Sequence, residues 1–327
     1  MLLLTLLAQA EAHCPDAPAL RDPDGEVVVL SQNLKFIATG AHRAERAALL
    51  ARYLAGEGAA VDLLLLSEAR ITDELRMWSA DWCFYTQDGD GVREPYHWHV
   101  LSDDHPPAGL ALGVRQRPWG VERAVAGHAG RRFRARPVSL AEGFLGRLVG
   151  YHKGWAGLVV DDTQIVWSHT QASYHRRPAR GAGEARRGRR GQFEDLAQDL
   201  GRPDRATLLT GDLNLLAGFR PERDEDDAYV RDARAVDDRT VGWFRELTDI
   251  DLDWFKAREG TFRGSVRKDK DHPFWDRDAP YDRVGVNAAF LRRHPGTKVR
   301  PVEIADDVLR VSDHVGLVIT IPYDAGR

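Results

Sequence analysis

The strongest constraint in this sequence of 327 residues is a series of eight short apolar runs, each of strand length. They lie at residues 26–33, 61–69, 109–116, 153–160, 163–170, 206–214, 281–288 and 313–321. The runs are rich in Val, Ile and Leu and are bounded by turn-forming residues, which is typical of buried strands. Segments 42–58 and 191–201 have apolar residues at helical spacing and end in Gly. Strands that alternate with helices predict an α/β fold in which helices cover sheet faces.

The overall composition is that of a soluble globular protein, with 43% hydrophobic and 29% charged residues. The net charge of −4 argues against a protein that coats nucleic acid, but it does not exclude one that cuts nucleic acid locally. No segment approaches the roughly 20 apolar residues that a membrane-spanning helix needs. Because no clear linker divides the chain, we expect residues 14–327 to form a single domain.

The N-terminus begins with a short apolar run that is followed by a small-x-small pattern at Ala8–Ala10. We expect residues 1–13 to be a signal peptide, which predicts a secreted or periplasmic protein. The alternative is a frayed apolar N-terminus on a cytoplasmic protein. The two cysteines, Cys14 and Cys83, allow either one disulfide that closes a long loop or two unrelated thiols.

Polar residues of the types that carry chemistry begin or end six of the apolar runs. They are Asn33, Glu68, His169, Asp212, Asn214, Asp282, Asp313 and His314. Each one alone has an ordinary explanation as a turn or loop residue. If the strand ends converge, however, the carboxylates repel one another, and burying them without compensation costs several kcal/mol each. A divalent cation resolves this conflict, so the set predicts a Mg²⁺ site that is shared with a substrate phosphate.

The order of these motifs along the chain resembles the endonuclease/exonuclease/phosphatase superfamily, which has the deoxyribonuclease-I-like fold. The matching segments, spread over residues 26–322, are SQNLKF, LLLLSEA, WSHTQAS, LLTGDLNLL, YDRVGV and VSDHVGLVI. The resemblance implies a four-layer α/β/β/α sandwich of two mostly antiparallel sheets flanked by helices. It also implies a phosphoesterase that uses Mg²⁺ or Mn²⁺ and no organic cofactor.

The resemblance implies a role for each metal-binding candidate. Glu68 is expected to bind the metal, with Asn33 beside it. Asp313 is expected to act as a second metal-binding or hydrogen-bonding carboxylate. Many family members follow the late Asp with Tyr or His, whereas this chain has Arg283, which leaves the geometry around Asp282 open.

The resemblance also implies the catalytic roles. Asp212 positions or activates the attacking water, and Asn214 holds that water or a phosphate oxygen. His314 is a general base or a phosphate contact, and Asp282 orients its imidazole. His169 contacts the phosphate or protonates the leaving oxygen. Gly211 is expected to make the turn that precedes the Asp-x-Asn pair.

The substrate is less constrained than the chemistry. The HTQAS stretch at residues 169–173 is similar to that of sphingomyelinase-type members, so we favour an extracellular phospholipid, contacted at a membrane surface by a peripheral monomer. Seven arginines in residues 175–190, with Arg176 and Arg177 as substrate-binding candidates, favour a nuclease that acts on DNA or RNA instead. A phosphomonoesterase and a non-catalytic binding module stay open as further alternatives. We expect the acidic 221–238 segment to be a solvated loop. For the basic 175–190 segment, a solvated loop and a patch that contacts the substrate stay open as alternatives.

Overall fold

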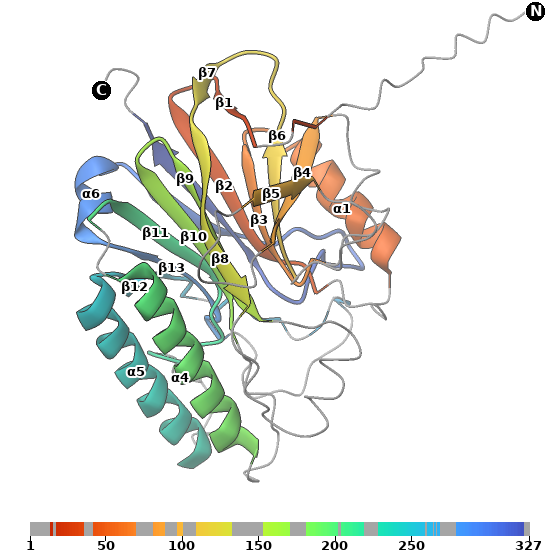
Figure 1. Ribbon diagram of the computed structural model, residues 1–327. Helices are drawn as coiled ribbons and strands as arrows, with labels where there is room; N and C mark the ends of the chain where they lie inside the picture. Colours follow the sequence, from red (N-terminus) through yellow and green to blue (C-terminus); the bar gives the residue numbers. More distant parts are fainter. Residues whose placement is uncertain are drawn as a thin grey trace, which may run out of the picture.

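The computed structural model consists of two packed β-sheets with helices on their outer faces (Figure 1). It describes residues 14–15, 18–35, 42–69, 81–88, 97–100, 109–132, 153–170, 181–201, 204–218, 228–258, 260–263, 265, 267–268 and 279–323. The expected signal peptide at residues 1–13 lies outside these residues, so it stays a prediction, as does the single-domain assignment.

The larger sheet has seven strands. Their order across the sheet is β14 (Lys298–Val302), β15 (Gly316–Pro322), β2 (Glu26–Asn33), β3 (Leu63–Ser67), β6 (Leu110–Arg115), β4 (Trp82–Asp88) and β5 (His97–Val100). Strands β2 and β3 run parallel, and the other neighbouring pairs are antiparallel. Both strands of the parallel pair are almost fully buried, as expected for strands covered on both faces.

The smaller sheet has six strands and repeats this arrangement. Their order is β12 (Asp251–Lys256), β13 (Asp282–Val286), β11 (Ala206–Asp212), β10 (Thr163–His169), β9 (Gly154–Val160) and β8 (Val125–Arg132). Again one central pair, β10 and β11, is parallel, and the other pairs are antiparallel. A short ribbon of β1 (Leu20–Asp22) and β7 (Val121–Arg123) lies outside both sheets.

Three apolar layers hold the sandwich together. Alternate side chains of both sheets, among them Leu65, Leu208 and Leu317, form the core between the sheets. Helix α1 (Arg43–Ala55) packs on the outer face of the seven-stranded sheet. Helices α4 (Gly181–Leu200) and α5 (Ala228–Thr248) pack together beside the six-stranded sheet (Figure 1). The short helix α6 (Ala288–Arg293) follows β13. The expected four-layer sandwich is therefore confirmed.

The charged segments 175–190 and 221–238 are both helical in part, so the expectation of a solvated loop at 221–238 was wrong. Residues 181–190 form the first half of α4, and residues 228–238 form the first half of α5. A buried ion pair between Arg189 and Asp237, with Nη2–Oδ1 at 2.7 Å, joins the two helices. One charge from each segment is thus neutralised inside the structure.

Cys14 and Cys83 form a disulfide, with their Cα atoms 5.5 Å apart, so the alternative of two unrelated thiols was wrong. The bond ties the segment before β1 to strand β4, across 69 positions of sequence. In the described part of the chain, every helix is too short or too polar to cross a membrane.

Candidate active site

The site is built by the two parallel strand pairs. In a parallel pair both strands end at the same edge of the sheet. In the seven-stranded sheet, Asn33 at the end of β2 pairs with Ser67 at the end of β3, directly before Glu68. In the six-stranded sheet, β10 and β11 end in His169 and Asp212. These two edges lie together, because Asn33 Nδ2 donates a hydrogen bond to Asp212 Oδ2 across the sandwich at 2.9 Å.

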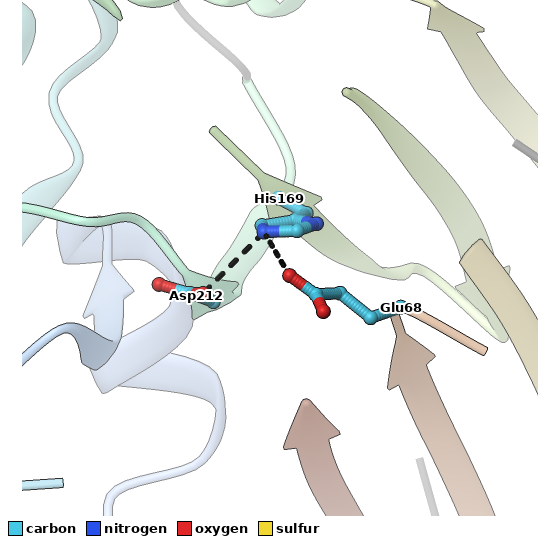
Figure 2. A group of neighbouring side chains, drawn as sticks. All are labelled: Glu68, His169 and Asp212. Atoms are coloured by element: carbon cyan, nitrogen blue, oxygen red, sulfur yellow. Dashed lines mark ion pairs between the residues drawn. The ribbon is translucent and has the colours of Figure 1, made fainter. Parts of the chain in front are cut away.

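Glu68, His169 and Asp212 form the first of two polar groups at this edge, which we call the acid–histidine group (Figure 2). His169 Nε2 lies 3.3 Å from Glu68 Oε1 and 3.4 Å from Asp212 Oδ2. All three side chains are buried. Burial lowers the pKa of His169, and the nearby charge of Lys153 lowers it further, so the neutral imidazole is favoured.

Lys153 also belongs to this group, and the sequence analysis did not identify it. Its Nζ lies 3.7 Å from Glu68 Oε1 and 3.1 Å from His169 Nδ1, and only 8% of the residue is exposed. In the β9–β10 hairpin His169 pairs with Gly154, so the residue before β9 reaches the same edge. Only this pairing register indicates that Lys153 lies near His169. The sequence alone shows a lysine before an apolar strand, which is a common pattern. Burial lowers the pKa of the Lys153 ammonium.

Asp212, Asp282 and His314 form the second polar group, which we call the proton-holding group. His314 Nδ1 lies 2.8 Å from Asp282 Oδ2, and His314 Nε2 lies 3.8 Å from Asp212 Oδ2. Asp282 reaches this edge because it begins β13, where that strand pairs with the end of β11. The rings of Phe262 and His314 are in contact, with centroids 5.2 Å apart.

The charges of this group favour a protonated His314. Burial lowers the pKa of the imidazole, but the charges of Asp282 and Asp212 outweigh burial and raise the pKa to about 10. Burial raises the pKa of Asp282. For Asp212, burial acts upward, but the charge of His314, the hydrogen bond with His169 and the charge of Lys153 outweigh it, so its pKa falls below the ordinary value. Asp212 is therefore a carboxylate at neutral pH.

Arg283 explains the departure from the family pattern after Asp282. The guanidinium is buried. It donates hydrogen bonds to the carbonyl oxygens of Leu215 at 3.2 Å and Ala217 at 2.5 Å, and its Nη1 lies 2.5 Å from Asp253. Arg283 thus holds the loop that follows Asn214, while the preceding residue still reaches the histidine.

The backbone at the strand ends is unusual. Glu68 and Asn214 have φ values of 51° and 50°, in the left-handed region that residues other than glycine rarely adopt. Asn214 Nδ2 donates to the Thr170 carbonyl at 3.0 Å, and Asn214 N donates to Asp212 Oδ1 at 3.1 Å. These bonds hold the Asp-Leu-Asn segment in place. Such strained positions are characteristic of functional sites.

Gly211 lies within β11 and not in a turn, so its expected role was wrong. Its φ is +121°, and a Cβ at this position would overlap the carbonyl oxygen of Ser168 on β10. Glycine is needed here because the two parallel strands approach closely where they deliver His169 and Asp212.

The remaining predicted residues lie in different places. Asp313 is buried and forms an ion pair with Lys35, and it belongs to neither of the two groups. Asn33 likewise contacts Asp212 as a hydrogen-bond donor. Arg176 and Arg177 lie outside the described residues. The metal and substrate roles of these four residues therefore stay predictions.

The donor atoms of the acid–histidine group fit a divalent cation. One ligand atom from each of Glu68, His169 and Asp212 lies within 4.8 Å of the others. Carboxylate oxygens are the ligands that Mg²⁺ and Mn²⁺ prefer, and imidazole nitrogen also suits first-row transition metals. Two buried carboxylates this close together would repel each other, and a cation between them would remove that cost.

Known structures share this fold. D. rerio TDP2 in complex with a single-stranded DNA product is 16% identical over 91% of this chain and 99% of that one, with a TM-score of 0.52. Beta toxin 275-280 from Staphylococcus aureus is 13% identical over 90% and 99% of the two chains, with a TM-score of 0.54. SmcL is 15% identical over 91% and 99%, with a TM-score of 0.51. Identities this low establish the fold alone.

No curated protein sequence matches this chain. The Endonuclease/Exonuclease/phosphatase family model, in contrast, matches residues 30–314, most of the sequence. This range includes all the strand ends that form the two polar groups. The chain therefore belongs to the endonuclease/exonuclease/phosphatase family.

Proposed function

We propose that this protein is a divalent-metal-dependent phosphodiesterase that hydrolyses its substrate by in-line attack of an activated water. The observation that carries the proposal is the position of Asp212, whose Oδ2 lies 3.4 Å from His169 Nε2 and 3.8 Å from His314 Nε2. A carboxylate that is common to both polar groups can hold a water molecule between them. A pure binding module would not need both groups.

Different residues bind the metal, orient the attacking water and donate a proton. Glu68 and Asp212 would hold Mg²⁺ or Mn²⁺, which when bound supplies positive charge to a phosphate oxygen. Asp212, ionised at neutral pH, accepts a hydrogen bond from the attacking water and orients it. His314 carries a proton, so it donates to a phosphate oxygen on which negative charge develops. Asp282 fixes the orientation of that imidazole through the 2.8 Å contact with Nδ1.

His169 has a different role from His314. Its lowered pKa makes it a poor proton donor to a leaving oxygen. The neutral ring lies between Glu68 and Asp212, at 3.3 and 3.4 Å, and so holds the two carboxylates in place. We therefore assign His169 an orienting role.

We propose an exported enzyme that acts as a monomer on a phospholipid of the sphingomyelin type at a membrane surface. The Cys14–Cys83 disulfide supports export, because disulfides persist mainly in oxidising compartments. The HTQAS stretch that begins at His169 supports a lipid substrate, because it is similar to that of sphingomyelinase-type members of the family. In sphingomyelin vesicles with Mg²⁺ we expect release of choline phosphate. We expect a chelator to abolish the release and His314→Gln to slow it by about 10²- to 10³-fold. A protein that binds the metal but releases no choline phosphate would rule out this substrate.

A nuclease is the second candidate, because the solved TDP2 complex shows that this fold accommodates a single-stranded DNA product. The arginines of residues 175–190 support it less than the sequence suggested. Arg189 is buried against Asp237, and Arg190 pairs with Glu194 on its own helix. A nuclease should nick plasmid DNA, and its activity should fall steeply as salt is raised. Intact plasmid at low salt would eliminate this alternative.

A panel of phosphate esters separates the remaining alternatives. A phosphomonoesterase would release phosphate from 4-nitrophenyl phosphate faster than it cleaves bis(4-nitrophenyl) phosphate, and a phosphodiesterase would show the reverse order. Each substrate is assayed with the wild type beside His314→Gln. If the variant matches the wild type on every ester, the site does not catalyse the reaction, and the proposed function is wrong.

A further inference from the structure

We infer that Lys35 binds an anionic oxygen of the substrate phosphate, and that Asp313 holds this lysine in place and is not a second metal ligand. The inference rests on the proposed function, because it takes the edge around Asp212 and His314 to be the phosphate site. It assigns a substrate contact to a residue that the proposed mechanism does not use. It also decides between the metal-binding and the hydrogen-bonding role expected of Asp313.

Lys35 is attached to the site through both its backbone and its side chain. Its backbone N donates a hydrogen bond to Asn33 Oδ1 at 2.9 Å, and Asn33 Nδ2 donates in turn to Asp212 Oδ2. Its Nζ contacts Asp313 Oδ2, and the Asp313 carboxylate is close enough for its charge to act on His314. The φ of Lys35 is 47°, in the left-handed region, so these contacts hold a strained backbone. The ammonium is thereby kept beside the proton-holding group.

Arg46 fixes the two chain segments that carry Lys35 and Asp313. It is buried on α1, and it donates hydrogen bonds to the carbonyl oxygens of Leu34 and, at 2.7 Å, of Val311. Its charge also acts on Asp313, so this buried carboxylate faces two cations. Among the described residues, Asp313 belongs to neither group of side chains that could hold a metal ion. A carboxylate in direct contact with an ammonium gains little from a divalent cation, which the ammonium would repel.

Exposure separates Lys35 from the other cations near the site. Of the Lys35 side chain 39% is accessible, whereas Lys153 and Arg46 are buried. An ammonium has three N–H donors, and in the described part of the chain Asp313 is the one acceptor that Nζ contacts. Donors are therefore left for a phosphate oxygen, which can approach Lys35 from solvent.

The first test compares Lys35→Met with the wild type in steady-state kinetics on bis(4-nitrophenyl) phosphate at saturating Mn²⁺. We expect KM to rise about tenfold, because a hydrogen bond from a charged donor to the phosphate is lost. We expect kcat to fall by less than about threefold, since ground state and transition state lose the same contact. Inhibition by dimethyl phosphate should weaken by the same factor as KM. Lys35→Arg keeps the charge and should restore both values to within about threefold of the wild type.

Lys256→Met is the matched control. Lys256 has a similar exposure, with 34% of its side chain accessible, and it also pairs with a carboxylate, that of Asp253 on β12, at 3.3 Å. Its removal should leave KM unchanged. If both variants raise KM equally, a general attraction between positive charge and substrate explains the effect, and the inference is wrong.

The double variant Lys35→Met with Asp313→Asn tests the role of Asp313. It removes both charges of the pair with little change in side-chain volume. It should therefore fold even if Lys35→Met, which leaves a buried carboxylate without its lysine, does not. In a calorimetric titration with Mn²⁺ the double variant should bind within about threefold of the wild type, while its KM again rises about tenfold.

Two results from the double variant would overturn the inference. A loss of Mn²⁺ affinity of about tenfold or more would show that Asp313 is a metal ligand. An unchanged KM would show that Lys35 serves only to neutralise Asp313, which is a structural role.

The inference and the proposed function fail in different ways. If the wild type hydrolyses no ester of the panel, or if His314→Gln matches the wild type, the proposed function is wrong and the inference falls with it. If the wild type is active and depends on His314, but neither Lys35→Met nor the double variant raises KM, only the role of Lys35 is wrong.

Discussion

His169 and His314 occupy comparable positions with opposite consequences. Both are largely or fully buried, and both lie within 4 Å of Asp212 Oδ2. Yet the pKa of His169 is lowered and that of His314 is raised to about 10. Burial acts in the same direction on both, so the neighbours decide: Lys153 lies against one ring, and Asp282 is hydrogen-bonded to the other. One half of the site is thereby suited to hold a cation, and the other holds a proton.

Asp212→Asn should have the largest effect, because this residue is common to both halves. We expect kcat to fall by about 10⁴-fold, since the variant loses both the water-orienting carboxylate and the charge opposite His314. Steady-state kinetics on the most reactive ester of the panel measure this. A loss no greater than that in His314→Gln would show that Asp212 acts in one half only.

His314→Gln and Glu68→Gln should separate the two halves. We expect His314→Gln to lower kcat by about 10²- to 10³-fold, because a charged donor to the phosphate is lost, while Mn²⁺ affinity stays within about threefold of the wild type. Glu68→Gln should instead lower Mn²⁺ affinity. Calorimetry and kinetics on the same preparations give both values. If either variant changes both properties to the same extent, the halves are not separable.

The pH dependence of stability should have opposite signs for the two histidines in metal-free protein. The raised pKa of His314 contributes stability below its ordinary value of 6.5, and this contribution is lost as the pH rises towards about 10. The lowered pKa of His169 contributes stability above 6.5, and this contribution is lost as the pH falls below that value.

Urea unfolding between pH 5 and 10, with a chelator present, measures these slopes. His314→Gln should flatten the alkaline side, and His169→Gln should flatten the acid side. Glu194→Gln, at a half-exposed position of α4, is a suitable control that should change neither. Identical profiles for the two histidine variants would contradict the assignment of opposite pKa shifts.

Arg283→Lys should have the smallest effect on catalysis. The variant keeps a charge near Asp253 but loses the fork that binds the carbonyl oxygens of Leu215 and Ala217. We expect a loss of about 1–3 kcal/mol in the free energy of unfolding, with kcat reduced by less than tenfold. A much larger loss of kcat at unchanged stability would mean that Arg283 acts on the chemistry directly.

The sequence predicts the centre of the sandwich better than its edges. Strands such as β2, β3 and β11 are buried on both faces, so their uninterrupted apolar runs identify them. Edge strands such as β5 and β14 carry charged or polar residues and pair with one neighbouring strand each, and the apolar pattern did not reveal them. Helix α5 was not predicted because its acidic first half is typical of a solvated loop. The buried ion pair between Asp237 and Arg189, which stabilises the helix against α4, is visible only in the structure.

The site residues likewise fall into those that the sequence predicts and those that only the structure reveals. Glu68, His169, Asp212 and His314 follow or begin apolar strands, so their positions could be predicted once the strand ends were expected to converge. Lys153 depends on the register of the β9–β10 hairpin, and Arg283 depends on the direction of one buried side chain. Neither property is encoded in local residue pattern, so the structure was needed to find them.

The left-handed backbone at Glu68 and Asn214 has a practical consequence for trapping a substrate complex. Glycine adopts this conformation without strain, so exchanging Glu68 for glycine would relieve backbone strain at the same time as it deletes a metal-binding carboxylate. We therefore expect Glu68→Gly to be inactive but stably folded. Such a variant could be used to capture the natural ester uncleaved and to identify it.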